Sequence, residues 1–354
     1  MKFKAIGKAM ALMLGVSLAI TPVCATETTK PVLEIQKAID MAIGKDDTIG
    51  QYSRNIEVYK EQQTGTSDIS SLNYNTKKIE IEETEQKKVY RKDVLTKEVT
   101  DAYQNMVLLQ KNMDLLEEQI NLGEKQVKQI QIKKEKGYSD ELTYEKAVQN
   151  LENTKVSLEQ VEKNLEDAKK SFLQLTNLNV DNYTLELDAT YEPLVLDKDI
   201  TAYATGMANQ LVKYMNQKVE LNEENFWDTI YQSGPEGGGP TYATYLEQKV
   251  SMQNAKDNAK SAYDTYKLLI QTKYTALNAQ LDTVKTKMNA YNTALKDMRV
   301  LEIKYKAGYV SAIDYETQKT QLDALEVDYL KEVFGYNSLK GQIEKPWTMS
   351  EYSF

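Results

Sequence analysis

The stretch IKKEKGYSDELTYE, residues 132–145, occurs a second time in altered form as IKYKAGYVSAIDYE, residues 303–316. The two stretches align without a gap at a shift of 171 residues, and six of their 14 positions are identical. Unrelated coiled coils can share a register of apolar residues, but they have no reason to share the Gly-Tyr pair in the middle. The sequence therefore contains an internal duplication, and the same shift places Tyr103 on Tyr274.

A heptad pattern flanks each Gly-Tyr pair. Before the first pair, apolar or small residues alternate at spacings of 4 and 3 from Leu95 to Ile130, and a matching series runs from Tyr144 to Leu175 after it. Similar but less regular series flank the second pair. Such series joined by a short turn predict antiparallel coiled-coil hairpins. The fold class that we predict is all-α, with two duplicated long antiparallel coiled-coil helical hairpins in an elongated molecule.

Glycine, proline and polar clusters divide the chain further. We predict a signal peptide at 1–25, a first helical repeat at 26–179 with its hairpin turn near 137–140, a non-helical connector at 180–199, and a second helical repeat at 200–354 with its turn near 307–310 and a short C-terminal tail. Within these units we expect helices over about 31–63, 77–136, 140–176, 200–231, 243–306 and 310–343, and a short strand at 183–187.

The first 25 residues indicate export. Lys2, Lys4 and Lys8 precede an apolar run at 9–20, and the small residues of the sequence VCA at 23–25 fit a cleavage site. An uncleaved anchor and a lipoprotein are the alternatives, but the run is shorter than the ~20 residues that span a bilayer. We therefore predict a protein that is exported by a signal peptide into the extracytoplasmic cell envelope.

The composition excludes most catalytic chemistry. The chain has no histidine, and its single cysteine is Cys24 within the predicted leader. This excludes disulfides, thiol nucleophiles, histidine bases and the common zinc sites from the mature protein. The carboxylates fall at helix-surface spacings, and the net charge of −9 disfavours nucleic acid as a partner. We predict no enzyme activity, no cofactor, no metal site and no nucleic-acid partner.

The duplicated helix pair, with KYKAGY at 304–309 and IDY at 313–315, resembles the TolC-type outer-membrane efflux protein family. The segments AIDMA at 38–42 and ATGMA at 204–208 look like the openings of that family's two repeats, and the resemblance covers nearly all of residues 32–343. In the family, three chains form a helical tunnel below a β-barrel that crosses the outer membrane. The tunnel is the exit duct of drug-efflux pumps and secretion systems.

The resemblance departs from the family at two places. The family inserts barrel strands into each repeat, whereas the matching breaks here are only 64–73 and 233–241. A membrane strand needs about 9–11 residues of alternating polarity, so neither break holds a hairpin of strands. The expectation is therefore a barrel-less member: a TolC-like α-barrel protomer without the β-barrel, not inserted in an outer membrane as a β-barrel.

The resemblance also implies a function and partners. It implies a non-enzymatic envelope component of an efflux or export assembly: a helical tunnel or scaffold, homo-oligomeric and trimeric by resemblance, that works with a periplasmic-adaptor-like (membrane fusion) protein and an inner-membrane transporter. The alternative is a secreted structural coiled-coil spacer with no transport role. An oligomer with a solvated lumen favours the first reading, and a rod-like monomer or dimer favours the second.

The hairpin turns are the candidate functional sites. By matching position, the family's adaptor-docking tips correspond to Gly308, Tyr309, Val310 and Ser311, with Gly137, Tyr138 and Ser139 as the paired tip. A simpler interpretation is that both glycines only supply the positive φ that ends a helix. That interpretation leaves the repeated tyrosine unexplained, because a helix reversal needs only the glycine.

Overall fold

The computed structural model describes residues 30–69, 71–186, 189–232 and 241–352. Within them the chain forms eight α-helices and two short 3₁₀ helices, with no cis peptide bond. The α-helices are α1 (Ile35–Lys45), α2 (Asp47–Thr64), α3 (Leu72–Glu135), α4 (Glu141–Thr176), α5 (Ile200–Leu211), α6 (Lys213–Gln232), α7 (Tyr242–Lys306) and α8 (Ala312–Glu344); the 3₁₀ helices are η1 (Val180–Asn182) and η2 (Pro346–Thr348). The predicted all-α fold is confirmed.

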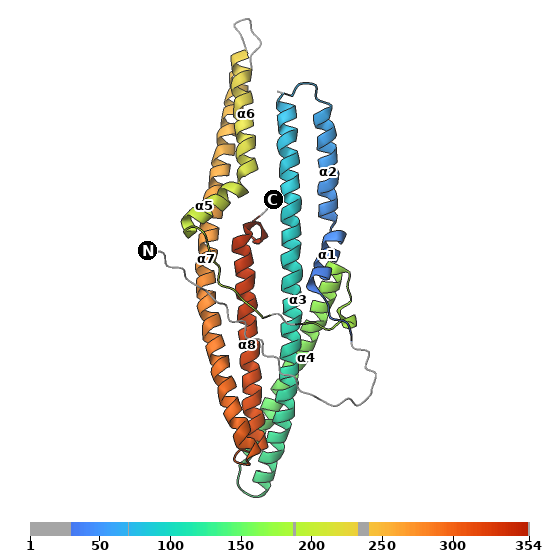
Figure 1. Cartoon of the computed structure of the whole chain (residues 1–354), viewed down its shortest axis with the longest axis vertical. Helices are drawn as coiled ribbons and strands as arrows, with labels where there is room; N and C mark the ends of the chain where they lie inside the picture. Colours follow the sequence, from blue (N-terminus) through green and yellow to red (C-terminus); the bar gives the residue numbers. More distant parts are fainter. Residues whose placement is uncertain (1–29, 70, 187–188, 233–240, 353–354) are drawn as a thin grey trace, which may run out of the picture.

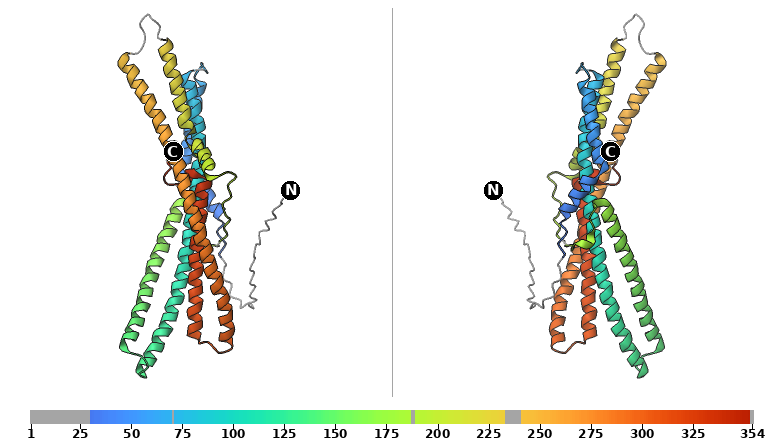
Figure 2. Two further views of the ribbon diagram at one scale, coloured as in Figure 1. Left: turned by 90° about the vertical axis from the view of Figure 1, so that its left-hand side faces the viewer. Right: turned by 90° about the vertical axis from the view of Figure 1, so that its right-hand side faces the viewer.

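Helices α3 and α7 are the two long axes of the molecule. They contain 64 and 65 residues, about 96 Å each at 1.5 Å per residue. Each pairs with the helix that follows it, so α3–α4 and α7–α8 form the two antiparallel hairpins, and the molecule is elongated along them (Figure 1). Both hairpin turns lie at the same end of the molecule, and the two hairpins diverge toward them (Figure 2).

The helices form a single row in each half of the molecule. On the side of the hairpin turns the order is α4, α3, α8, α7, and on the other side it is α2, α3, α6, α7 (Figures 1 and 2). Thus α2 takes over the place of α4, and α6 takes over that of α8, while α3 and α7 run through both halves. Helix α1 packs on α3 and α4, and α5 packs on α7.

Two apolar clusters hold the row together near its middle. The first joins the segment before α1 to the α3–α4 seam and includes the fully buried Val99, Met106 and Phe172. These three residues lie on the predicted heptads. The second cluster lies in the α7–α8 seam and includes Leu277, Val284 and Tyr336. The heptads therefore predicted the internal packing of each hairpin correctly.

The sequence did not predict the packing between the hairpins. Leu115 and Leu122 of α3 are buried although they lie off the predicted heptad. They share a helix face with Lys111, Glu118 and Lys125, which form ion pairs with α8. Helix α3 thus has a second packing seam, in which leucines alternate with charged residues. Because the charged residues interrupt the apolar pattern, the sequence analysis did not identify this seam.

Two predicted helices are wrong in that each is divided. The helix expected over 31–63 is broken at Asp46, whose extended backbone lets its carboxylate accept the Ile49 N–H at 2.8 Å and cap α2. The helix expected over 200–231 is broken at Val212, which is buried and leaves helical geometry between α5 and α6. At Asp46 a local cap starts a new helix, and at Val212 the break accompanies burial of the side chain.

The connector crosses the row as an extended strap, described over residues 183–186 and 189–199 (Figure 1). The strand expected at 183–187 is reduced to one parallel bridge between Val32 and Thr184, with Leu187 outside the described residues. The predicted signal peptide and the break at 233–240 also lie outside the described residues, and so does Cys24. The first break is described except for residue 70: α2 ends at Thr64 and α3 starts at Leu72.

Candidate docking site at the hairpin tips

Both hairpin turns end their first helix with the same motif. The N–H of Tyr138 donates to the Lys133 carbonyl (2.8 Å) and the N–H of Gly137 to the Lys134 carbonyl (2.9 Å). In the second turn, the N–H of Tyr309 donates to the Lys304 carbonyl and the N–H of Gly308 to the Tyr305 carbonyl, both at 2.9 Å. This is the Schellman arrangement, in which the glycine is left-handed. Gly137 and Gly308 have φ values of +77° and +79°.

The return helices are capped by different residues at equivalent positions. The Asp140 carboxylate accepts the Thr143 N–H at 2.7 Å, and the Ser311 hydroxyl accepts the Asp314 N–H at 3.1 Å. The hydrogen bond to Thr143 holds the pKa of Asp140 below its ordinary value. The duplication therefore conserves the geometry of the turn but changes its charge, because one cap is a carboxylate and the other a hydroxyl.

The tyrosine is the most exposed part of each turn. Tyr138 is 81% exposed and Tyr309 is 83% exposed. Ser139 and Val310 are half-buried, and Gly137, Gly308 and Ser311 are exposed. The Schellman geometry uses only the backbone of the tyrosine, so its ring has no role in the turn. A large amphipathic ring held in solvent by a rigid backbone is the kind of group that proteins use as a contact residue.

A second pair of residues stiffens each tip and was missed by the sequence reasoning. In the first tip the Lys134 ammonium lies 4.7 Å from the centroid of the Tyr144 ring and pairs with Glu141 at 2.5 Å. The hydrogen bond to Glu141 raises the pKa of Lys134. In the second tip, Tyr305 and Tyr315 stack with centroids 4.5 Å apart. The signal was present, because the shift of 171 places Tyr144 on Tyr315 and Lys134 on Tyr305.

The structure brings the two tips to the same end of the molecule, on separate hairpins (Figure 2). Near this end the hairpins are linked by polar contacts between α3 and α8. Lys125 pairs with Glu316 at 2.7 Å, and the Gln126 amide donates to the Thr317 hydroxyl at 3.4 Å. The seven candidate residues therefore form two small surfaces that face the same way.

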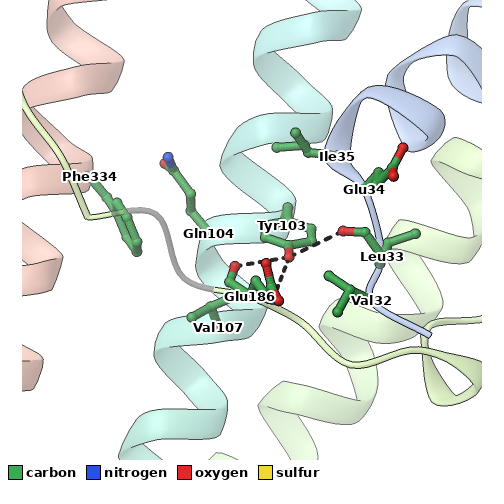
Figure 3. Close-up of a pocket in the computed structure, with 9 residues that line it drawn as sticks. All are labelled: Val32, Leu33, Glu34, Ile35, Tyr103, Gln104, Val107, Glu186 and Phe334. Atoms are coloured by element: carbon green, nitrogen blue, oxygen red, sulfur yellow. Dashed lines mark hydrogen bonds between the residues drawn. The ribbon is translucent and has the colours of Figure 1, made fainter. Parts of the chain in front are cut away.

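A second feature lies at the middle of the molecule, where the strap crosses α3. A cavity of about 270 Å³ opens between the segment before α1, the strap and α8 (Figure 3). Its centre is the Tyr103 hydroxyl, which accepts the Glu186 N–H at 2.9 Å and lies 3.0 Å from the Glu186 carbonyl. Val32, Val107 and Phe334 give it apolar walls. These bonds fasten the strap to α3.

The described residues contain no group of three or more His, Cys, Asp or Glu side chains that could hold a metal ion. Among the described helices, none combines the length and the apolar character that crossing a membrane requires.

No protein-family profile matches the sequence, and no curated protein matches it. Solved structures do. The chain superposes on CusC, reported to undergo transmembrane channel formation, with a TM-score of 0.62 over 92% of this chain and 94% of that one at 11% identity. It is similar to the outer membrane protein VceC of Vibrio cholerae (TM-score 0.59, 10% identity, 89% and 96% covered). It is also similar to the open MtrE outer membrane channel of Neisseria gonorrhoeae (TM-score 0.55, 13% identity, 93% of each chain). The fold that the TolC-type resemblance implied is confirmed.

Proposed function

We propose that this chain, whose fold is that of the outer membrane channels above, is a wall subunit of an export tunnel in the cell envelope. It acts by shape and self-association and performs no chemistry. The observation that carries the proposal is the single row of helices. A row one helix thick has two faces and two free margins, formed by α2 with α4 on one side and by α7 on the other.

Both margins carry exposed apolar side chains. On α4 these are Leu142 and Val156, which are 57% and 58% exposed. On α7 the apolar set extends over most of the helix and comprises Leu246, Val250, Leu268, Val300 and Ile303. Apolar residues on an unpartnered edge indicate a further protein contact. Because the two margins differ, another copy joins head to tail, and such an interface closes into a ring when the rotation permits.

The ring would be a homo-oligomer, for which the resemblance favours a trimer. All its hairpin tips would then face one way, around one mouth of the tunnel. We assign the tips the role of docking a periplasmic-adaptor-like protein that connects the tunnel to an inner-membrane transporter. The exposed Tyr138 and Tyr309 support this role, since each is held out by a turn that does not need its ring.

The test is the mass of the mature protein at micromolar concentration, measured for the wild type and three variants. Val156→Glu on the α4 margin and Val300→Glu on the α7 margin should each dissociate the oligomer, because a carboxylate in an apolar contact is strongly unfavourable. The matched control is Val195→Glu in the strap, at a valine that is 83% exposed and lies on neither α4 nor α7. It should leave the oligomer intact.

A monomeric wild type at all concentrations would contradict the proposal and favour the structural spacer. Equal dissociation by Val195→Glu would show that the oligomer does not use the margins of the row.

A further inference from the structure

Helices α6 and α8 occupy the same place in the two halves of the row. An interval separates the part of that place filled by α6 from the part filled by α8. On α3, helix α6 pairs through Lys218 with Glu83, and α8 hydrogen-bonds through Ser338 to Asp101. On α7, α6 pairs through Glu223 with Lys256, whereas α8 pairs through Glu332 with Gln280. Between these pairs lie 90–93 of α3 and 266–273 of α7, where α5 also packs: its Ala204 is buried in one cluster with Ile270, and its Gln210 amide donates to the Tyr90 hydroxyl at 3.4 Å.

The residues after α8 turn into this interval and fill it. The Trp347 ring stacks on Tyr90 of α3 with centroids 4.2 Å apart and planes 13° apart. Its indole N–H donates to the Asp93 carboxylate at 2.9 Å. Asp93 also pairs with Lys345 at 2.7 Å. One short segment of α3 thus holds the tail by stacking, a charge-assisted hydrogen bond and an ion pair.

The same tail also reaches α7. Met349 is only 3% exposed and joins Ile270 in a small buried cluster. The Tyr352 ring lies 5.2 Å from that of Tyr266, and burial raises the pKa of Tyr352 well above its ordinary value. Glu351 pairs with Lys273 at 3.0 Å. The tail therefore bridges α3 and α7 with an aromatic and an ionic contact on each side.

The first repeat contains a counterpart of this tail. The shift of 171 places Met349 on Leu178, which is buried at the end of α4 in the first apolar cluster. Each repeat thus has a buried apolar residue and a short 3₁₀ helix after its hairpin, but η1 follows Leu178 whereas η2 precedes Met349. The second version differs in that it adds aromatic contacts, through Trp347 and Tyr352.

We propose that the interval between α6 and α8 is a peptide-binding socket on α3 and α7, whose occupant is the chain's own segment 345–352. When segment 345–352 occupies the socket, the wall of the row is closed between α6 and α8. When the socket is empty, the wall has a lateral opening there. That the opening would lead into a tunnel rests on the function proposed above. Occupancy of the socket does not rest on that function, because every contact lies within one chain.

The first experiment measures the accessibility of a buried thiol. Ile270→Cys places a thiol at a position that is fully buried and in contact with Met349. Leu277→Cys places one two turns further along α7, 2% exposed and packed against α8. Each substitution is made in the leader-free chain, which then has no other cysteine, with and without residues 346–354. A hydrophilic maleimide reports the rate of labelling.

Deletion of the tail should make the thiol at 270 reactive within minutes and leave that at 277 protected, since the two large apolar clusters contain no tail residue. Protection of both thiols after the deletion would overturn the proposal, because the tail would cover nothing. Reactivity of both would also overturn it, because the tail would then belong to the core of the fold.

The second experiment adds the tail back as a peptide. A synthetic peptide of residues 345–352 should restore protection of the thiol at 270 in the truncated chain. The same peptide with Trp347→Ala should not, because it lacks the ring that stacks on Tyr90 and the N–H that reaches Asp93. Equal protection by both peptides, or by neither, would contradict a specific socket. All of these outcomes are independent of oligomer formation and of adaptor binding.

Discussion

At the scale of single residues, the tip glycines are held in a conformation that other residues adopt at a cost. Gly137→Ala and Gly308→Ala should each lower the free energy of unfolding by about 1–2 kcal/mol, because an L residue in the left-handed region is strained by that amount. Neither added methyl would meet another atom within 4 Å, so the loss would come from the backbone alone. Urea unfolding followed by far-UV circular dichroism measures it.

The matched control is Gly206→Ala in α5. This glycine is helical, and a Cβ there would also meet nothing within 4 Å. The same substitution should therefore stabilise the protein by about 0.5–1 kcal/mol, since alanine is the better helix former. A loss of stability at all three glycines would show that the backbone explanation is wrong.

The tip tyrosines should matter for binding and not for folding. The double variant Tyr138→Ala/Tyr309→Ala should keep its helicity and its oligomeric mass, because exposed substitutions usually change stability by less than about 0.5 kcal/mol. It should lose capture of the adaptor-like protein in a pull-down from the same envelope. Tyr242→Ala, at an exposed tyrosine that starts α7 at the opposite end, should keep capture. Normal binding by the double variant, or its unfolding, would show that the tips are only turns.

At the scale of elements, the junction between α1 and α2 makes stability depend on pH. Arg91 donates two hydrogen bonds to one Asp46 carboxylate oxygen, at 2.8 and 3.1 Å. Burial raises the pKa of Asp46, but the hydrogen bonds from Arg91 and from the backbone at Ile49, together with the charge of Arg91, outweigh it and hold the pKa below its ordinary value. A carboxyl group whose pKa is lowered by folding stabilises the fold at pH values above its unfolded pKa, and that contribution is lost as the pH falls through the folded pKa.

Asp46→Asn should separate the charge of this residue from its capping role, because asparagine also caps helices well. At neutral pH the variant should melt at a lower temperature than the wild type. The difference should begin to shrink as the pH falls below about 4, the pKa of an unfolded aspartate, and should vanish below the lower pKa of the folded carboxyl group. Melting temperatures measured between neutral and acidic pH test this. A difference that stays constant across the range would mean that the cost is not electrostatic.

The elements that sequence alone could predict are those fixed by local rules. The heptads around Gly137 and Gly308 predict both hairpins, and the Gly-Tyr pairs predict where they turn. The break at Asp46 is a local helix cap that also pairs with Arg91, and the break at Val212 accompanies a buried side chain; the sequence analysis predicted neither. Leu115 and Leu122 were missed because charged residues interrupt their stripe. The fold of residues 345–352 depends on a socket made by α3 and α7, which no local pattern encodes. Of the candidate site, the sequence located the turns but not their stiffening pairs.

At the scale of the whole molecule, the two hairpins resemble each other, but the seam between the hairpins differs from the seams within them. Each hairpin has an apolar seam, whereas in the seam between α3 and α8 the buried Leu115 and Leu122 alternate with partly exposed ion pairs, including Lys319 with Glu118 at 2.8 Å. Salt screens such pairs, and at 1 M the screening length is only about 3 Å. High salt should therefore loosen one hairpin against the other and leave each hairpin intact.

Spin labels test this in the leader-free chain, whose only thiols would be the introduced ones. Labels at Tyr138→Cys and Tyr309→Cys report the distance between tips, and its distribution should broaden at high salt. Labels at Lys128→Cys on α3 and Gln149→Cys on α4, both at exposed positions, should be unaffected. Broadening of both distributions would indicate unfolding of a hairpin, and broadening of neither would show that the ion pairs do not hold the hairpins together.

The place where the strap is fastened to α3 also has a mechanical consequence. Tyr103 lies almost midway along a helix that runs without a break from Leu72 to Glu135. A rigid helix that is held at its centre pivots there, so that any tilt about Tyr103 displaces the two ends in opposite directions. With arms of about 45 Å, a tilt of about 5° moves each end by about 4 Å. Mechanical work applied at the tips would thus reach the far end of the molecule through one helix, with its sense reversed.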